Sequence, residues 1–567
     1  MKKTTQLLIV SILLIINCQL SIVNCAAQTP SWLWAENGDG STSQNAKMGI
    51  ANDADGNTIV CGNYLSDSIT FGYYTLHNSS PGSYDLFLVK YDATGNVIWA
   101  VSHGGDGDDY SYSVATDATG NIYVTGTIGS DSIIFGNTTL HGTNFHQVFV
   151  VKYNANGDVV WARGPQGSIA FNGIATDAAA NVYLAGSLGT NMNLIFGNDT
   201  LTSTIYLSRN FILVKYDSSG NPIWGRMGAC SGNSEPYVEP HYVTTDAMAN
   251  VFVTGGFASP TLNFGHDTIL DSVQALNMFV VKYDSSGNSV WAKKVGTADG
   301  IGQLQGKGVG VDAHGNVYIG GDAFSTRIDF GTDTLNTIAL YDIFMAKYDQ
   351  TGNFVWAKVI GGDDYDYCSG LKADPNGDFY ITGYFGSTYI ALGLDTIHNS
   401  NALGNQNIYV IKYNASGNEL WASAPAGDGQ SAGIAGDGHG NEWITGYYPS
   451  TTMVFGTHTL NNNSGGNDIF TAKLMNLVTA IPVENKGTVR IYPNPNTGSF
   501  TLAYAQLSAV TQFKVTDLFG RTVYTQNITG ARAEQTINAG ILQDGVYFWQ
   551  LISANRIEAN GKMTVLR

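Results

Sequence analysis

Short stretches in which apolar and polar positions alternate recur along this 567-residue chain. In VFVVKY (148–153), Phe149, Val151 and Tyr153 fall on one face of an extended strand, because side chains alternate sides along a strand. VVWAR (159–163) follows after Asn-x-x-Gly-Asp, a turn sequence in which Gly takes the left-handed conformation without steric cost. The pattern therefore predicts an antiparallel hairpin of two short strands.

This hairpin belongs to a longer unit that recurs along the chain. VKYDATGNVIWA (89–100) returns in five further copies, whose tryptophans lie 62 to 67 residues apart. Two more strands are expected before each hairpin, such as SVATD (113–117) and NIYVTGTI (121–128). Four-stranded repeats are typical of propeller blades, so the pattern predicts an all-β, seven-bladed β-propeller over residues 28–475. The repeat places lysine at Lys90, Lys152, Lys215, Lys282, Lys347, Lys412 and Lys473, tryptophan at Trp34, Trp99, Trp161, Trp224, Trp291, Trp356 and Trp421, turn-opening aspartate at Asp53, Asp117, Asp177, Asp246, Asp312, Asp374 and Asp437, and Phe-Gly or Leu-Gly at Gly72, Gly136, Gly197, Gly265, Gly331, Gly393 and Gly456.

The two ends of the repeat array complement each other. The array begins with a lone fourth strand, SWLWA (31–35), and its last copy stops after a third strand at Lys473. Pairing SWLWA with the strand around Phe470 would complete the seventh blade and cover two sheet edges that would otherwise favour aggregation. A closed ring is therefore expected rather than an open solenoid, which would need capping repeats.

The stretch GGDGDDYSYSVATDATGNIYVTG (104–126) resembles the bacterial β-propeller repeat called the SBBP repeat. The resemblance covers about residues 32–474 and implies a propeller without an established chemistry. Two copies depart from the pattern, with Asp177-Ala-Ala-Ala-Asn and Asp246-Ala-Met-Ala-Asn in place of the Gly-containing turn. We expect a different local turn at these two places.

The N-terminal residues have the pattern of a signal peptide. Lys2 and Lys3 precede an apolar run over 7–16, and Cys25-Ala26-Ala27 supplies small residues for cleavage, so residues 1–27 are predicted to be removed. A retained membrane anchor and a lipoprotein are less favoured alternatives. No later stretch is long and apolar enough to span a bilayer, so no transmembrane segment is expected after signal removal.

The charge of the chain limits its partners. The net charge is −18, and loss of the two leader lysines makes it −20, which argues against nucleic acid and anionic membranes as partners. Solubility is the simpler reason for this acidity, and cation binding is the alternative. The scattered cysteines Cys61, Cys230 and Cys368 form neither a disulfide framework nor a zinc motif.

The last 80 or so residues follow a different pattern. Alternating strands separated by Asn-Pro, Phe-Gly and Asp-Gly turns predict a small Ig-like β-sandwich over 487–567, after a linker at 476–486. The sequence of this part resembles the C-terminal sorting domain of the type IX secretion system of Bacteroidota. The matching residues are Tyr492, Pro493, Asn494, Pro495, Gly520, Arg521, Gly545, Tyr547 and Lys562. The resemblance implies the secretion machinery as a partner, and a protein that is secreted or attached to the outer surface of the cell outer membrane.

Catalytic chemistry is not evident in the sequence. HExxH, GxSxG, Walker and spaced Cys/His motifs are all absent. The repeated lysine lies among apolar residues, where an unpaired ammonium is costly, so a carboxylate or carbonyl partner is expected rather than seven binding lysines. The turn DADGN (53–57) is interpreted as a hairpin turn and not a calcium loop, because Tyr64 stands where an EF-hand needs Glu.

The connections from each Trp strand to the next unit are the candidate ligand-binding loops. They vary between copies and are rich in carboxylates and tyrosines, which bind calcium or sugar hydroxyls and stack on sugars. Solvated acidic loops are the simpler interpretation. The candidate binding residues are Asp106, Asp108, Asp109, Tyr110, Glu235, Glu239, His241, Asp363, Asp364, Tyr365 and Asp366.

The sequence thus favours a non-catalytic surface or secreted binding protein, with a glycan, protein or particle as ligand. An extracellular lyase or hydrolase on the same face of the propeller is the alternative. No cofactor is identified, and calcium is the one that the acidic loops suggest.

Overall fold

The structure of the protein is a computed structural model, and the residues that it describes form strands and turns without a helix. It describes residues 30–566 except 43–47, 143–146, 166–168, 190–191, 204–208, 232–235, 272–274, 299, 301, 340, 393–395, 402–404, 439, 464, 476–488, 495, 505–510, 518–520, 529–532, 541, 544 and 554–555. The predicted signal peptide and the predicted linker lie outside these residues. The chain divides into two compact units, which we call the ring unit (1–476) and the tail unit (477–567).

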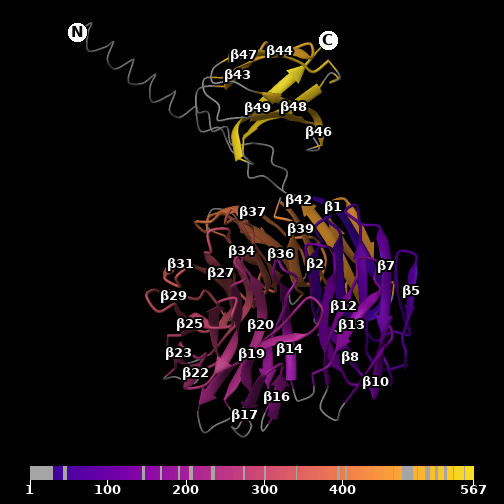
Figure 1. The fold of residues 1–567 in the computed structure, drawn as a ribbon, viewed down its shortest axis with the longest axis vertical. Coiled ribbons are helices and arrows are strands. Elements are labelled where there is room, and N and C mark those ends of the chain that lie inside the picture. Colours follow the sequence, from indigo (N-terminus) through magenta and orange to yellow (C-terminus); the bar gives the residue numbers. More distant parts are fainter. Residues whose placement is uncertain are drawn as a thin grey trace, which may run out of the picture. The chain divides into compact units, whose positions relative to one another are not determined.

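The described part of the ring unit contains seven antiparallel sheets, each with a core of four strands (Figure 1). We number them in the order of their first strands. Sheet 1 contains β2 (Gly49–Asn52), β3 (Thr58–Tyr64), β6 (Asp85–Tyr91) and β7 (Val97–His103); sheet 2 contains β8 (Asp109–Thr116), β9 (Ile122–Ile128), β12 (Gln147–Tyr153) and β13 (Val159–Arg163); sheet 3 contains β14 (Ile169–Thr176), β15 (Val182–Leu188), β18 (Asn210–Tyr216) and β19 (Pro222–Ser231); sheet 4 contains β20 (Tyr237–Thr245), β21 (Val251–Ala258), β24 (Asn277–Tyr283) and β25 (Ser289–Thr297); sheet 5 contains β26 (Gln303–Val311), β27 (Val317–Phe324), β30 (Asp342–Tyr348) and β31 (Phe354–Ile360); sheet 6 contains β32 (Asp366–Ala373), β33 (Phe379–Phe385), β36 (Asn407–Tyr413) and β37 (Glu419–Ser423); and sheet 7 contains β38 (Gln430–Gly436), β39 (Asn441–Tyr448), β42 (Asn467–Met475) and β1 (Ser31–Thr42).

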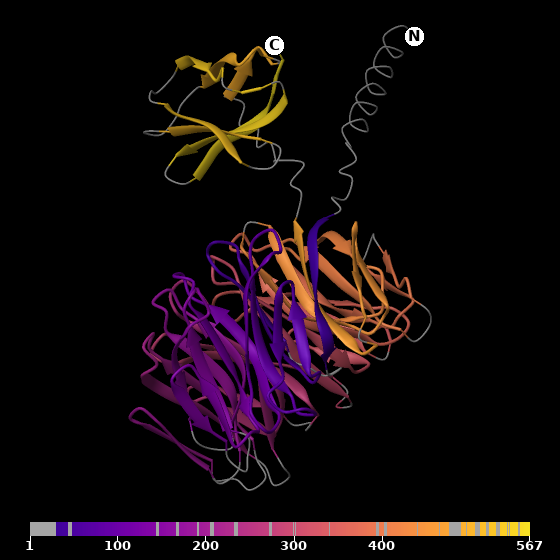
Figure 2. The same ribbon diagram turned by 90° about the vertical axis from the view of Figure 1, so that its right-hand side faces the viewer.

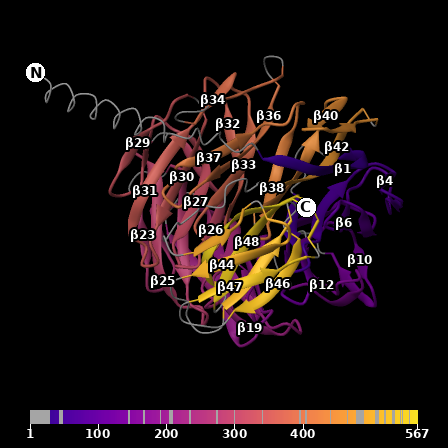
Figure 3. The ribbon, with the colours of Figure 1, turned by 90° about the horizontal axis from the view of Figure 1, so that it is seen from above.

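The strand from the N-terminal part of the chain completes sheet 7. β1 pairs antiparallel with β42, and Asn37 lies opposite Phe470, so the pairing predicted for SWLWA is confirmed. Figure 2 shows the indigo strand β1 among the orange strands of sheet 7, and Figure 3 shows β1 beside β42. The first strands of successive sheets also contact one another in a closed cycle, because β38 of sheet 7 contacts β2 of sheet 1.

Apolar side chains fill the spaces between neighbouring sheets. The cluster between sheets 1 and 2 contains Cys61, Leu88, Val124 and Phe149, and an equivalent cluster containing Trp34, Val60 and other residues lies between sheets 7 and 1. The closing junction therefore has a core like the others. Such burial of apolar surface is the main source of stability in a sheet-on-sheet fold.

Each sheet also carries a short hairpin that the four-strand interpretation missed. The hairpin lies between the second and third strands, and its turn contains the recurring Phe-Gly pair. β4 of sheet 1 pairs with β1, the outer strand of the preceding sheet, through Asp39 and Thr70, so this hairpin covers an edge that would otherwise be unpaired. The hairpins are β4 (Ser68–Phe71) with β5 (Tyr74–His77), β10 (Ser132–Phe135) with β11 (Thr138–His141), β16 (Met192–Phe196) with β17 (Asp199–Ser203), β22 (Thr261–Asn263) with β23 (Thr268–Leu270), β28 (Arg327–Asp329) with β29 (Thr334–Asn336), β34 (Tyr389–Ala391) with β35 (Thr396–His398), and β40 (Thr452–Phe455) with β41 (His458–Asn461).

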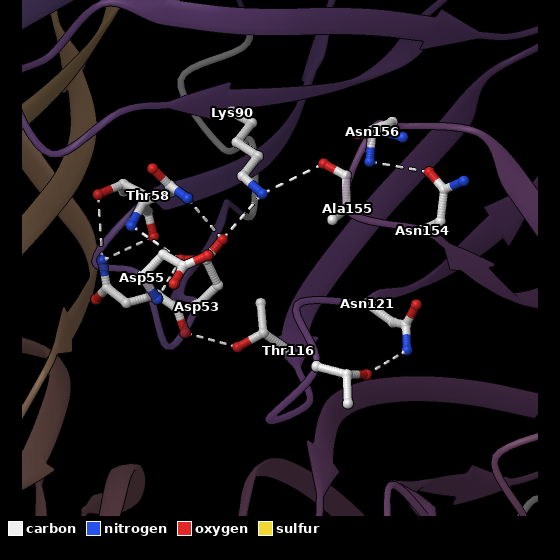
Figure 4. A network of polar contacts seen from close by, with 12 residues as sticks. Asp53, Asp55, Thr58, Lys90, Thr116, Asn121, Asn154, Ala155 and Asn156 are labelled. Atoms are coloured by element: carbon white, nitrogen blue, oxygen red, sulfur yellow. Dashed lines mark hydrogen bonds and ion pairs between the residues drawn. The ribbon is translucent and has the colours of Figure 1, made fainter.

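The repeated lysine and tryptophan join neighbouring sheets. In sheet 1, Lys90 Nζ donates to the carbonyl oxygen of Ala155 in the hairpin turn of sheet 2 and lies 2.9 Å from Asp53 Oδ2 (Figure 4). Trp99 Nε1 donates to the same carbonyl at 3.1 Å. We call this contact the hairpin clasp. The lysine contacts are Lys152 to Ser218, Lys215 to Ser285, Lys282 to Gln350, Lys347 to Ala415 and Lys473 to Ala93, and the tryptophan contacts are Trp161 to Ser218, Trp291 to Gln350, Trp356 to Ala415 and Trp34 to Ala93.

The clasp explains why the hairpin turn needs glycine. Gly95 has a φ of +95°, and a Cβ atom there would lie 2.9 Å from the Trp34 ring. The turn thus requires both a left-handed backbone and a surface without a side chain, and only Gly supplies both. The hairpin VKYDATGNVIWA (89–100) and its copies therefore join one sheet to the next.

The expectation of a different turn at the two Ala-containing copies is wrong. Ala180 N donates to Asp177 O at 2.9 Å, as Gly120 N does to Asp117 O at 3.0 Å. Ala180 takes a φ of 60°, and Ala249 a φ of 59°. The aspartate side chain accepts enough hydrogen bonds to hold the turn even where Ala must adopt the left-handed conformation, at a cost of about 1–2 kcal/mol.

The junction between sheets 6 and 7 differs from the other junctions. Lys412 pairs with Asp378 Oδ2 at 3.2 Å, and Trp421 Nε1, like Trp224 Nε1 of sheet 3, is buried without a hydrogen-bond partner among the described residues. Glu442, only 1% exposed, stands where five other sheets have an apolar residue, and both its carboxylate oxygens lack a partner within the described part of the chain. The apolar equivalents are Ile122, Val182, Val251, Val317 and Phe379. The charged and titratable groups near Glu442 are Lys372, Asp374, Asp378, Tyr380, Lys412 and Asp437.

The tail unit has two antiparallel sheets, which form two layers in Figure 2. They share an apolar core that includes Phe500, Phe513 and Trp549. One sheet contains β43 (Val489–Tyr492), β44 (Ser499–Tyr504) and β47 (Ala533–Asn538), and the other contains β46 (Thr522–Ile528), β45 (Thr511–Thr516), β48 (Gly545–Ser553) and β49 (Arg556–Val565).

The residues of the predicted sorting motif have structural contacts in this unit. Asn494 Nδ2 donates to the carbonyl oxygen of Lys562 at 3.1 Å, and Asn496 N donates to that of Thr564 at 2.9 Å, so the segment after Tyr492 and Pro493 is bound to the last strand. Arg521 pairs with Asp517 at 2.8 Å, and Tyr547 OH donates to Gln543 O at 2.9 Å. Gly545 begins β48, whereas Pro495 and Gly520 lie outside the described residues.

Loss of the clasp at the closing junction should weaken the fold. Trp34→Phe removes a hydrogen bond to Ala93, so we expect the free energy of unfolding to fall by about 1 kcal/mol beyond the loss caused by Trp421→Phe. Trp421→Phe is the control, because the Nε1 atom of Trp421 has no hydrogen-bond partner among the described residues. Urea denaturation followed by circular dichroism measures both variants, and equal losses would contradict the role of the clasp.

Glu442 should destabilise the ring unit, increasingly so at higher pH. Burial raises the pKa of Glu442 well above 4.5, so the folded protein keeps a proton that the unfolded chain releases. The free energy of unfolding therefore falls as the pH rises above about 4.5 toward the raised value. Glu442→Val should remove this decrease and stabilise the protein by about 1–4 kcal/mol at about pH 8. Denaturation at about pH 5 and about pH 8 tests this, and a destabilised Val variant at both values would refute it.

Candidate functional site

A cavity of about 690 Å³ lies at the centre of the ring unit, and we call it the well. The first strands of all seven sheets contribute to its wall, which also includes side chains from the second strands. Its lining residues that matter below are Tyr112, Asn172, Glu239, His241, Tyr242, Gln305, Lys307, Asp322, Tyr341, Tyr367, Tyr384, Gln430 and Tyr447.

The lining ends at a layer of aliphatic side chains, which we call the collar. Each sheet contributes one residue, three positions before its turn aspartate. Apart from Thr244, no described residue between the collar and these turns lines the well. The first strands approach closely here, because a Cβ on Gly433 would lie 3.2 Å from Ile50 Cγ2. The collar contains Ile50, Val114, Ile174, Val243, Val309, Leu371 and Ile434.

Polar side chains gather above the collar on the side of sheets 3 to 5. Glu239 accepts hydrogen bonds from Tyr237 OH and, at 3.4 Å, from Asn172 Nδ2. His241 Nδ1 lies 3.0 Å from the carbonyl oxygen of Gly306, and its Nε2 lies 3.7 Å from Glu239 Oε2. Burial lowers the pKa of His241, so the ring is neutral near pH 7 and this contact is not an ion pair there.

Asp322 is the most distinctive group in the well. It is 4% exposed, and its Oδ1 atom has no hydrogen-bond partner within the described part of the chain. Burial raises the pKa of Asp322 to about 6, against the opposing effects of Lys307 and the backbone N–H of Cys368. An unsatisfied buried acceptor is costly unless a ligand or water supplies a donor.

Aromatic side chains from sheets 5 and 6 form a continuous group beside Asp322, which we call the tyrosine belt. Tyr341 lies 5.1 Å from both Phe324 and Tyr367, measured between ring centroids, and Tyr367 lies 5.0 Å from Tyr384. Tyr365 lies 5.6 Å from Tyr341 and is 40% exposed. The belt thus runs from the solvent to the well.

The first group of sequence-predicted binding residues lies where sheet 2 begins. Asp106 and Asp108 are exposed, and their carboxylates accept hydrogen bonds from the backbone N–H groups of Asp131 and Tyr84. Asp109 is buried and accepts from Gly129 N and from Ser130. The Tyr110 ring lies 6.3 Å from that of Tyr112 in the wall of the well. The three carboxylates therefore hold loop backbone.

The second group lies where sheet 6 begins. Asp363 accepts hydrogen bonds from the N–H and hydroxyl of Thr388, and Asp364 N donates to Ser387 Oγ. Asp366 is buried, accepts from Gly362 N at 2.7 Å, and has its pKa raised to about 7 by burial. Glu239 and His241 line the well, whereas Glu235 lies outside the described residues. A binding role for these residues stays a prediction.

Metal and thiol chemistry gain no support from the described residues. They contain no group of three or more His, Cys, Asp or Glu side chains placed to hold a metal ion, and calcium stays untested. Cys61, Cys230 and Cys368 are buried free thiols. No described helix is long and apolar enough to cross a membrane.

The sequence did not single out Asp322, Lys307, Gln305 or Gln430. The signal that was missed appears when the seven copies are aligned by their turn aspartates. Ten residues after the turn aspartate, other sheets have Asn63, Thr127, Ser187, Gly256, Tyr384 or Tyr447, and only sheet 5 has a carboxylate. A charged residue at a position that is neutral in every other copy indicates a local role.

Comparison with known proteins identifies the C-terminal part of the chain. A family model described as a secretion system C-terminal sorting domain matches residues 490–565. This domain marks proteins that the type IX secretion system secretes or attaches to the cell surface, so the chain is secreted or attached to the outer cell surface and interacts with that machinery.

Other similar proteins match most of the chain. The uncharacterized WD repeat-containing protein L264 of Acanthamoeba polyphaga mimivirus is 23% identical, over 75% of this chain and 36% of its own length, so the chain spans about a third of that relative. PorZ of Porphyromonas gingivalis, a surface component of the type-IX secretion system, is 12% identical with a TM-score of 0.23 over 92% of this chain and 75% of its own. The Pan2 WD40 domain of Neurospora crassa is 7% identical with a TM-score of 0.36 over 79% of this chain and 96% of its own.

Proposed function

We propose that the protein is a non-catalytic binding protein of the cell exterior, and that its well binds a glycan. The seven sheets are then the blades of one SBBP-type propeller closed by β1, and the tail unit is an Ig-like sorting domain. A signal peptide over residues 1–27 directs the chain across the inner membrane. The cyclic contacts of the first strands and the apolar cluster between sheets 7 and 1 support the closed ring.

One observation carries the glycan proposal: the tyrosine belt ends beside Asp322, whose Oδ1 atom has no hydrogen-bond partner among the described residues. Aromatic rings stack on the apolar faces of sugars, and carboxylates accept hydrogen bonds from sugar hydroxyls. The volume of the well, about 690 Å³, falls within the range of about 300–1,000 Å³ that is typical of small-ligand sites. The well thus combines the two kinds of contact that a hydroxyl-rich ligand needs.

An extracellular hydrolase or lyase is the second candidate, because the well also contains groups suited to proton transfer. The pKa of about 6 makes Asp322 partly protonated near neutral pH, and Glu239 and the neutral His241 line the same cavity. Incubation of the protein with oligosaccharides, followed by chromatography of the products, separates the two functions. Products that disappear in Asp322→Asn would establish an enzyme.

The tyrosine belt should carry part of the binding energy. On an array of oligosaccharides, Tyr341→Ala should weaken binding about 5- to 10-fold, since an aromatic contact contributes about 0.5–1.5 kcal/mol. Tyr73→Ala is the control, because Tyr73 is fully exposed in the turn between β4 and β5. Equal binding by the parent and Tyr341→Ala would exclude the belt as the contact surface.

Export should depend on the tail unit. Deleting residues 487–567 should leave a folded ring unit in the periplasm, because the sorting domain alone is recognised by the secretion machinery. Asn496→Ala should also reduce export, since Asn496 binds the last strand, whereas Asn527→Ala, at an exposed position, should not. Cell fractionation in a host with a type IX secretion system measures the result. Surface delivery of the truncated protein would refute the assignment.

A further inference from the structure

We propose that the well takes the end of a neutral glycan chain, with the terminal sugar against Asp322 and the following sugars along the tyrosine belt. This inference rests on the proposed function and adds the class of ligand and its direction of entry. It follows from the apolar collar at which the lining of the well ends, from the hydrogen-bonding character of its wall and from its charge.

The collar is the last layer of the lining of the well. Val114, Ile174, Val309 and Leu371 of the collar are at most 7% exposed, and its other three side chains are partly exposed. A long polymer that crossed the ring from one face to the other would have to pass this apolar layer and lose the hydration of its hydroxyls. A ligand that enters from the side of the tyrosine belt therefore ends at the collar.

The wall above the collar offers acceptors for the hydroxyls of a terminal sugar. The carbonyl oxygen of Gly306 only accepts, so the neutral ring of His241 carries its hydrogen on Nδ1 and leaves Nε2 as an acceptor. Nε2 lies 3.7 Å from Glu239 Oε2, which accepts from Tyr237 OH, so a sugar hydroxyl can donate to Nε2. Asp322 Oδ1 is a second acceptor, without a partner within the described ranges.

The charge of the well selects against acidic sugars. Two carboxylates, Glu239 and Asp322, line it together with a single described ammonium group, that of Lys307. Lys307 already interacts with Asp322, since it lowers the pKa that burial raises. A uronate or a sulfated sugar would bring another negative charge beside these carboxylates, and like charges in a partly buried site repel strongly. Neutral sugars avoid this repulsion.

Tethered probes test the requirement for a chain end. Linear hexasaccharides of glucose, mannose, galactose, xylose and N-acetylglucosamine, and a hexasaccharide of glucuronic acid, are attached to a surface by one end, by the other end, or by both ends. The full-length protein should bind one or more neutral probes with a free end at least 10-fold more tightly than the same probe held at both ends. Equal binding to doubly tethered probes, or binding to the glucuronic acid probe alone, would overturn the inference and leave the glycan proposal intact.

A pair of matched variants tests the position of the terminal sugar. Asp322→Asn should weaken binding to the singly tethered probe at least 10-fold, because a hydrogen bond to a charged group contributes about 1.5–3 kcal/mol. Asp55→Asn makes the same change on an exposed hairpin turn and should bind as the parent does. Unchanged binding by Asp322→Asn would place the terminal sugar elsewhere and overturn the inference. Failure of the parent protein to bind any probe would overturn the inference and the proposed function together.

Discussion

The ring unit depends on one interaction repeated around it, the carbonyl oxygen of a hairpin turn that accepts from a lysine and a tryptophan of the preceding sheet. At the closing junction, Trp34 and Lys473 both donate to Ala93 O, although they come from opposite ends of the repeat array. Lys473 Nζ also lies 4.5 Å from the centre of the Trp443 ring, and this cation–π contact offsets part of the cost of burying the ammonium group. The contacts between sheets, the sequence of the hairpin turn and the closure of the ring therefore all involve the same hydrogen bonds to the turn carbonyl.

Much of the fold could be predicted from the sequence, because lysine and tryptophan recur at the same positions of the repeat and most of their copies make the clasp. The spacing of Trp and Lys gave the four main strands and the pairing of β1 with β42. The additional hairpins were missed since strands of three to five residues, such as β22 and β23, contain too few positions for an alternating pattern. The turn at Ala180 was missed because the hydrogen bonds that Asp177 accepts within the turn outweigh the conformational preference of one residue.

The candidate site was predictable in part, because Glu239 and His241 line the well and Tyr365 belongs to the tyrosine belt. Composition directed attention to Asp106, Asp109, Asp363 and Asp366, but carboxylates in these loops accept hydrogen bonds from nearby backbone and hydroxyl groups. The well is instead lined by residues from all seven sheets, whose equivalent positions lie about 65 residues apart in the chain. Their proximity follows from the ring and not from any local motif, so residues such as Asp322 and Gln430 become visible only once the sheets are assembled.

The position of β1 sets the order in which the ring unit can fold. Trp32 pairs with Leu474, about 440 residues away, whereas Lys90 pairs with Trp99 in the same hairpin. Closing the longer loop costs about 3 kcal/mol more in chain entropy, by logarithmic scaling with loop length. Sheets 1 to 6 can form from local contacts, but the ring can close only after the chain has been synthesised as far as residue 475, the end of β42. Until β1 and β42 pair, both strands present an unpaired sheet edge, and such edges are prone to association with other chains.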